Sequence, residues 1–112
     1  MTRPLPTPQS IGDAVREVIS SNIADGYTPS RFAGVTQAGT AQNLVDVCSK
    51  LINDPATAEW LENELNKRTT LLTIEDFVCR YGSAWNFSQA TINAACARVT
   101  YFDQVANRIR YK

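Results

Sequence analysis

The last quarter of the sequence is the feature that most constrains the fold. From Ser88 onward, apolar residues recur at steps of three and four over about 20 residues, with no glycine or proline among them. These residues are Ile92, Ala95, Cys96, Val99, Phe102, Ala106 and Ile109. This spacing puts apolar side chains on one face of an α-helix. We therefore expect one long helix from Ser88 to near Arg108. Its centre should bury Ile92, Val99 and Phe102.

Shorter helices are expected upstream, because capping residues and apolar stripes alternate along the chain. Ser10 precedes one stripe, Asp54 precedes Pro55 and a second stripe, and Thr73 precedes a third with acidic residues in its first turn. A further short helix is expected through Phe32 and Val35. The stretch 69–72 has strand character but is too short to build a sheet. The predicted fold class is all-α, a single small bundle of five or six helices with a long C-terminal helix.

The first nine residues differ from the rest in carrying three prolines, Pro4, Pro6 and Pro8. Prolines at this density favour an extended chain over a helix. We expect residues 1–9 to be a flexible proline-rich N-terminal arm and residues 10–112 to be the helical domain. Since the arm has few apolar residues to anchor it, we predict that it stays mobile or reaches a neighbouring copy.

The composition excludes several classes of function. The 112 residues include no histidine, which removes histidine-based catalytic triads and histidine metal sites. No glycine-rich phosphate loop is present. We therefore predict no enzyme activity, no catalytic residue, no metal ligand, no cofactor and no small-molecule substrate. Because no long apolar run and no signal-peptide pattern occurs, we expect a soluble, cytoplasmic protein without membrane contact.

The three cysteines, Cys48, Cys79 and Cys96, are widely spaced. An odd number with no Cys-x-x-Cys pair is a poor disulfide framework. Each lies among apolar residues of an expected helix. We predict that all three are reduced and buried.

Charge is distributed unevenly although the net charge is zero. Residues 1–67 hold five basic and eight acidic residues, a balance of −3, and residues 68–112 hold six basic and three acidic, a balance of +3. An acidic half joined to a basic half favours either head-to-tail packing of copies or an anionic partner for the basic half. We expect a homo-oligomer whose association weakens with salt.

The stretch TIEDFVCRYGSAWN, residues 73–86, holds the one Arg-Tyr-Gly step of the chain. One interpretation is structural: Arg80 pairs with Asp76 four residues earlier, and the aromatic residues are core. The other is functional: a guanidinium beside Tyr81 and Trp85 binds phosphate and stacks on unpaired bases. Gly82 would then let the ligand approach the backbone. Arg98, Asn107 and Arg108 on the last helix could extend such a site.

Two short patterns occupy this basic part of the chain. One consists of Phe77, Cys79, Arg80 and Trp85-Asn86, and the other of Arg80-Tyr81-Gly82, Asn86, Ala97-Arg98 and Phe102-Asp103. Both resemble patterns in the coat proteins of flexible filamentous plant RNA viruses, as does the helix from Leu44 to Cys48. The resemblance covers residues 40–107 and implies a helical core that self-assembles around RNA, in a virion. An arginine and an aspartate line the RNA groove of that family, which nominates Arg80 and Asp103, with Arg98 beside them.

The expected function is therefore a non-enzymatic assembly or binding protein, with single-stranded RNA as the candidate partner. The nucleic-acid-binding candidates are Arg80, Tyr81, Arg98, Asp103 and Arg108. One alternative is a protein–protein adaptor or a structural component of a larger particle. Another is a helix-turn-helix-like DNA-binding regulator built from residues 73–98, although its second helix opens QATINAA without a positive charge before Arg98.

Overall fold

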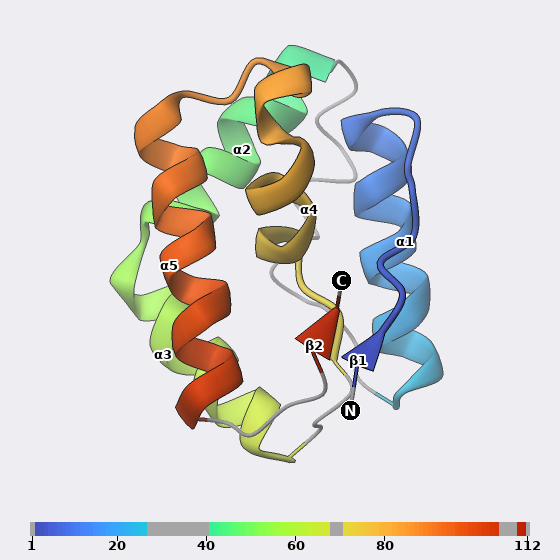
Figure 1. The fold of residues 1–112 in the computed structure, drawn as a ribbon, viewed down its shortest axis with the longest axis vertical. Coiled ribbons are helices and arrows are strands. Elements are labelled where there is room, and N and C mark those ends of the chain that lie inside the picture. The colour runs from blue at the N-terminus through green and yellow to red at the C-terminus, as the bar shows by residue number, and fades with distance from the viewer. Residues whose placement is uncertain (1, 27–40, 68–70, 106–109, 112) are drawn as a thin grey trace.

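The all-α prediction is confirmed. The computed structural model describes residues 2–26, 41–67, 71–105 and 110–111. Its five α-helices are α1 (Ile11–Ala24), α2 (Ala41–Asn53), α3 (Pro55–Lys67), α4 (Ile74–Tyr81) and α5 (Gln89–Val105), and a short 3-10 helix, η2 (Gly82–Trp85), follows α4. The long C-terminal helix is present, and α4 and α5 run side by side in opposite directions (Figure 1). Among these helices, none is both long and apolar enough to cross a membrane.

The predicted capping residues act as expected. Ser10, Asp54, Thr73 and Ser88 each accept a backbone N–H of the following turn, at 3.2, 3.0, 3.4 and 3.1 Å. At Thr73 the contact is reciprocal, since its N–H donates to Asp76 Oδ2 at 3.0 Å. Such a capping box satisfies two backbone donors that a helix start leaves without intrahelical partners. It fixes where α4 begins, and so where Arg80 lies.

The core of the described residues forms two clusters. The larger lies among α1, α2, α4 and α5, and its largest side chains include Ile11, Val18, Ile52, Ile74, Phe77, Phe87 and Ile92. The smaller joins α3 to the end of α5 through Leu61, Leu65, Leu71 and Phe102. Burial of Ile92 and Phe102 is thus confirmed. Val99 is only half-buried, because it shares the edge of α5 on which half-buried Cys96 lies three residues earlier.

The prediction that all three cysteines are reduced is wrong for two of them. Cys79 of α4 and Cys96 of α5 form a disulfide, with Cα atoms 4.8 Å apart. That separation lies within the range that a disulfide requires. Cys48 is fully buried, as expected, and is not part of the disulfide. The error arose because periodicity identifies the apolar face of each helix but not which faces meet.

The N-terminal segment lies against its own domain. Its residues Thr2–Arg3 form β1, which pairs in parallel with β2 (Arg110–Tyr111). Leu5 is buried in the larger core cluster, and Tyr111 packs against that cluster. The segment expected to be a free arm is therefore anchored through its one large apolar side chain after Met1. The helix expected through Phe32 and Val35, and the candidate Arg108, lie outside the described residues.

Candidate nucleic-acid interface

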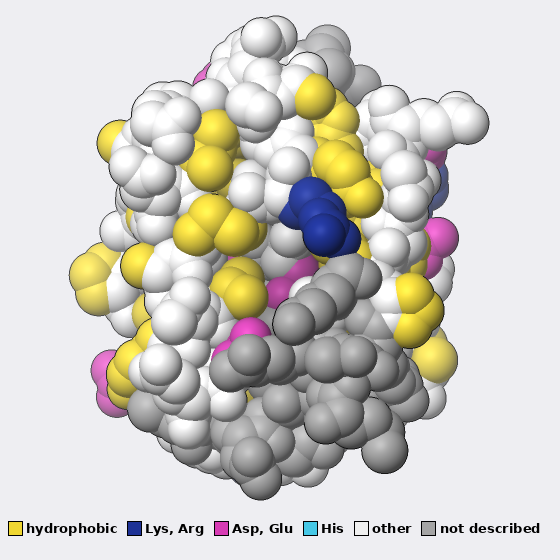
Figure 2. Space-filling view, in the orientation of Figure 1, with side chains coloured by type: hydrophobic (Ala, Val, Ile, Leu, Met, Phe, Trp, Pro, Cys, Tyr) yellow, Lys and Arg dark blue, Asp and Glu magenta, His cyan; other side chains and the backbone are white. Residues whose placement is uncertain are grey.

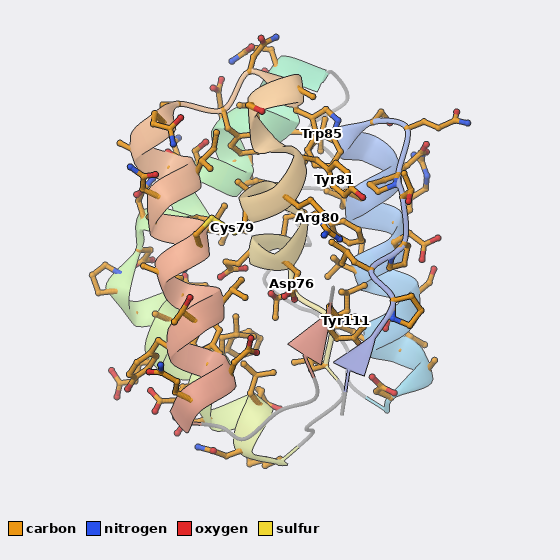
Figure 3. All side chains as sticks on the ribbon, in the orientation of Figure 1. Asp76, Cys79, Arg80, Tyr81, Trp85 and Tyr111 are labelled. Atoms are coloured by element: carbon orange, nitrogen blue, oxygen red, sulfur yellow. A yellow bond between two sulfur atoms is a disulfide. The ribbon has the colours of Figure 1, made fainter. Side chains whose placement is uncertain are left out.

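Arg80 lies in the last turn of α4 and is exposed. It makes no hydrogen bond or ion pair with any residue that the structure describes. The pairing with Asp76 that the structural interpretation required is therefore not formed, since Asp76 caps α4. The other carboxylate in the first turn of α4, that of Glu75, pairs with Arg98. In Figure 2 a basic side chain stands beside apolar side chains of the α4–η2 segment, at the position that Figure 3 labels Arg80.

An aromatic pair adjoins this arginine. Tyr81 and Trp85 are both half-buried, with ring centroids 5.7 Å apart and ring planes tilted by 39°. Both pack against the larger core cluster, which holds the rings in place. Trp85, Tyr81 and Arg80 follow one another along the side of α4 and η2 that faces α1 (Figure 3). We call Arg80, Tyr81 and Trp85 the Arg80 surface.

Gly82 has a packing role and does not open the backbone to a ligand. It is buried, and a Cβ atom placed on it would lie 2.9 Å from Ile92 Cγ1 and 3.2 Å from Val78 Cγ1. A side chain at this position would push α5 away from the end of α4. The Arg-Tyr-Gly step thus combines an exposed cation, a half-buried ring and a close helix contact. The prediction that Gly82 admits a ligand is wrong, because Ile92 occupies the space.

Arg98 is held inside the protein. Its Nη1 donates to the Leu51 carbonyl at 2.9 Å and to Glu75 Oε2 at 3.2 Å, and its Nη2 donates to the Asp54 carbonyl at 2.6 Å. The Arg98 side chain is 12% exposed and that of Glu75 is 0% exposed. The guanidinium therefore joins the turn between α2 and α3 to α4 and pairs with a buried carboxylate. This corrects the expectation that Arg98 extends a phosphate site beside Arg80.

The remaining candidates do not gather around Arg80. Asp103 is half-buried on α5, seven residues beyond Cys96, a distance of about 10 Å along a helix. Cys96 is bonded to Cys79, the residue before Arg80, and therefore marks the level of the Arg80 surface on α5. Asp103 lies about two turns further toward the C-terminal end of α5. Arg108 is outside the described residues. The structure brings together Arg80 and Tyr81, with Trp85 as the third member.

Arg98 also bears on the helix-turn-helix alternative. It is the one basic residue in α5, the helix that would read DNA. Its guanidinium is occupied by three internal acceptors. A recognition helix commonly presents exposed basic side chains to the major groove near its start. The first turns of α5 contain no basic residue, which argues against the helix-turn-helix alternative.

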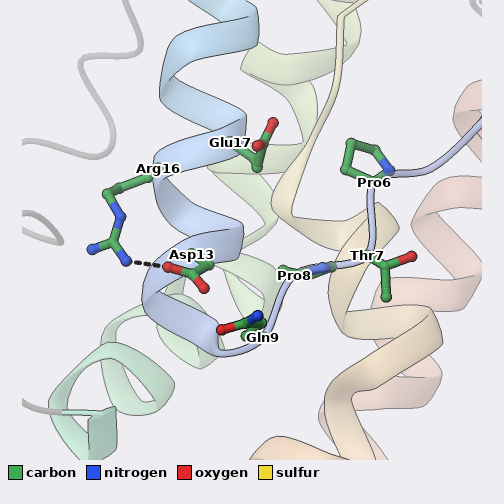
Figure 4. Close-up of a pocket in the computed structure, with 7 residues that line it drawn as sticks. All are labelled: Pro6, Thr7, Pro8, Gln9, Asp13, Arg16 and Glu17. Atoms are coloured by element: carbon green, nitrogen blue, oxygen red, sulfur yellow. Dashed lines mark hydrogen bonds and ion pairs between the residues drawn. The ribbon is translucent and has the colours of Figure 1, made fainter.

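An open pocket of about 420 Å³ lies between the N-terminal segment and α1 (Figure 4). Its lining residues are Pro6, Thr7, Pro8, Gln9, Asp13, Arg16 and Glu17. Arg16 pairs with Asp13 across one turn of α1, so the pocket's cation already has a partner. In the part of the chain that the structure describes, no group of acidic residues and cysteines could hold a metal ion.

The pKa of Tyr101 is shifted. The hydroxyl of Tyr101 on α5 donates to both carboxylate oxygens of Glu62 on α3, at 3.1 and 3.2 Å. The hydrogen bond to Glu62 raises the pKa of Tyr101 above 10.0, and the negative charge of Glu62 and partial removal from water add to the shift. This contact links two helices at the surface.

Comparison with protein-family models, with curated proteins and with solved structures gave no match to this chain. The likeness to viral coat proteins therefore stays a prediction that depends on the residue patterns alone.

Proposed function

We propose that this protein is a non-enzymatic binding protein that contacts the backbone of single-stranded RNA through the Arg80 surface and assembles with copies of itself. The observation that carries the proposal is Arg80, an exposed guanidinium without an internal partner among the described residues. It adjoins the half-exposed pair Tyr81 and Trp85. A guanidinium binds phosphate through paired hydrogen bonds, and aromatic side chains stack on unpaired bases without reading sequence.

Arginine and aromatic side chains together favour a single strand over a duplex. In a duplex the bases are stacked on each other, whereas in a single strand they can lie on a protein ring. A phosphate contact by Arg80 and stacking on Tyr81 and Trp85 do not depend on the identity of the base. We therefore expect binding that depends on strand state and salt but weakly on sequence.

The decisive experiment measures binding of a single-stranded RNA homopolymer by fluorescence anisotropy at several salt concentrations. Arg80→Ala should weaken binding to all sequences alike and lower the slope of log K against log salt by about 0.7, the value for one phosphate contact on a single strand. Lys50→Ala is the matched control, since Lys50 is an exposed basic residue on α2. Equal loss in both variants would mean a general charge effect. An unchanged slope in a folded Arg80→Ala protein removes Arg80 from the interface.

Self-assembly is tested separately. Electron microscopy of the purified protein with and without RNA should show filaments or rings that depend on RNA. Sedimentation at rising ionic strength should show weaker association, because attraction between acidic and basic surfaces is screened. If the wild-type protein binds no RNA and remains a monomer under all conditions, the coat-like function is wrong, and the adaptor alternative becomes the one to pursue.

A further inference from the structure

The disulfide encloses the candidate interface. Cys79 and Cys96 are 17 residues apart in sequence, and the loop between them contains Arg80, Tyr81 and Trp85. All three members of the Arg80 surface therefore lie in the segment that the covalent bond closes. A cross-link of this kind restricts the conformations open to the enclosed chain.

The bond also fixes how α4 is turned. Cys79 lies on the side of α4 toward α5, whereas Arg80 lies on the side toward α1 (Figure 3). Successive residues of a helix point about 100° apart, so holding Cys79 against α5 keeps Arg80 directed the other way. The disulfide thus contributes to fixing the direction in which the cation is presented.

Both sulfur-bearing residues can be reached from solvent. Cys79 and Cys96 are half-buried at the surface between α4 and α5, whereas Cys48 is fully buried. Disulfides near the surface are the ones that a small thiol reduces most readily, so we expect this bond to open without unfolding of the domain. Disulfides persist in oxidising compartments and are reduced by the thiol pools of the cytosol.

The fold has other contacts that hold α4 when the bond is open. The capping box of Thr73 and Asp76 fixes its start. Without the bond, its end is held by non-covalent packing alone, including the close contact between Gly82 and Ile92. The ion pair of Arg98 and Glu75 joins α5 to the first turn of α4. Reduction should consequently loosen residues 80–86 and leave the rest of the bundle intact.

We propose that the Cys79–Cys96 disulfide is a redox-sensitive clamp on the Arg80 surface: the oxidised protein presents a fixed binding surface, and the reduced protein a looser one that binds RNA more weakly. The inference depends on the proposed RNA-binding function for its consequence, but not for the clamp itself. In the opening step, a thiolate of a small dithiol attacks one sulfur and forms a mixed disulfide. The second thiol of the dithiol then attacks the dithiol's own sulfur in this mixed disulfide and releases the protein sulfur as a thiol. The protein gains two electrons and two protons as two thiols, and the dithiol becomes a cyclic disulfide.

The first test needs no RNA. The native protein is treated with dithiothreitol, its thiols are counted by alkylation and mass spectrometry, and its amide hydrogen exchange is mapped. The expected result is two newly labelled thiols, unchanged helicity, and faster exchange confined to residues 80–86, with α1 unaffected. No new thiols, or no change in exchange, would overturn the clamp. Loss of helicity would also overturn it, because the bond would then hold the whole fold.

The second test compares RNA binding by the oxidised and reduced protein. In the reduced protein, two or three side chains that the clamp had held in place must become ordered when RNA binds. This cost should weaken binding about tenfold. A Cys79→Ser/Cys96→Ser protein should bind RNA as weakly as the reduced form, and dithiothreitol should not change its affinity. The affinity of Cys48→Ala should fall with dithiothreitol as that of the wild type does. Equal affinity of the oxidised and reduced forms contradicts the regulatory role. Absence of RNA binding in both forms, with the exchange result as expected, refutes the RNA-binding function and this regulation of it, but leaves the redox opening of the clamp established.

Discussion

Arg80 and Arg98 lie on neighbouring helices, each close to one end of the same disulfide, and the structure treats them in opposite ways. Arg98 is 12% exposed and has three internal acceptors. Arg80 is exposed and has no partner among the described residues. A cation bound inside the fold contributes to stability, whereas an exposed cation without a partner is available to bind an anion. Variants of the two arginines separate these roles, and two further changes test the contacts around them.

The largest effect is expected from Arg98→Ala. This change removes the guanidinium of Arg98 from the buried carboxylate of Glu75 and from the carbonyls of Leu51 and Asp54, which should lower the free energy of unfolding by about 3–5 kcal/mol. Chemical denaturation followed by circular dichroism measures the loss. Arg98→Lys is the matched variant. It keeps the charge but has no planar fork to reach both carbonyls, so its free energy of unfolding should lie between those of the wild type and Arg98→Ala. A loss below about 1 kcal/mol for Arg98→Ala would contradict the anchoring role.

The next effect concerns the helix contact that supports the Arg80 surface. Gly82→Ala places a methyl group against Ile92 and should cost about 1–3 kcal/mol by overpacking. Gly12→Ala is the control, since its Cβ would lie 3.6 Å from the nearest side-chain atom, at the end of Arg16. That change should be neutral or stabilise α1, because alanine favours a helix. Equal stability of the two variants would show that α5 does not need Gly82 to approach α4.

Arg80→Ala should change stability by less than about 0.5 kcal/mol, as is usual for an exposed side chain without structural contacts. The same variant should lose RNA affinity, whereas Lys50→Ala keeps it. Thermal unfolding and anisotropy on the same samples give both values. A destabilisation comparable to that of Arg98→Ala would mean that Arg80 is a structural residue after all.

The smallest effect is at the Tyr101–Glu62 contact. The raised pKa of Tyr101 means that the folded protein holds the phenolic proton more tightly than the unfolded chain. Its contribution to stability is therefore complete below pH about 10 and is lost as the pH rises through the folded-state pKa. Ultraviolet titration of the wild type should show a tyrosine that titrates late, at a pH above about 10. In Glu62→Gln that tyrosine should titrate earlier, and an unchanged curve would refute the assignment.

Much of the fold was predictable because it depends on neighbours in sequence. The starts of α1, α3, α4 and α5 were correctly placed from Ser10, Asp54, Thr73 and Ser88, whose bonds span two or three residues. Less of the candidate site was predictable. Arg80 and Tyr81 lie together because they are consecutive. The predicted role of Arg98 was wrong, because its acceptors Leu51 and Glu75 are 47 and 23 residues away.

The sequence by itself determined that this chain is a helical bundle, where four of its helices begin, and many of the apolar side chains that enter the core, since helix periodicity and capping act over three or four residues. Only the tertiary structure decided that Cys79 meets Cys96 and that Gly82 makes room for Ile92. It also decided that the guanidinium of Arg98 is bound inside the protein whereas that of Arg80 is exposed. Each of these outcomes depends on which helix faces which. That arrangement is set by the packing of all the helices together, and no local pattern encodes it.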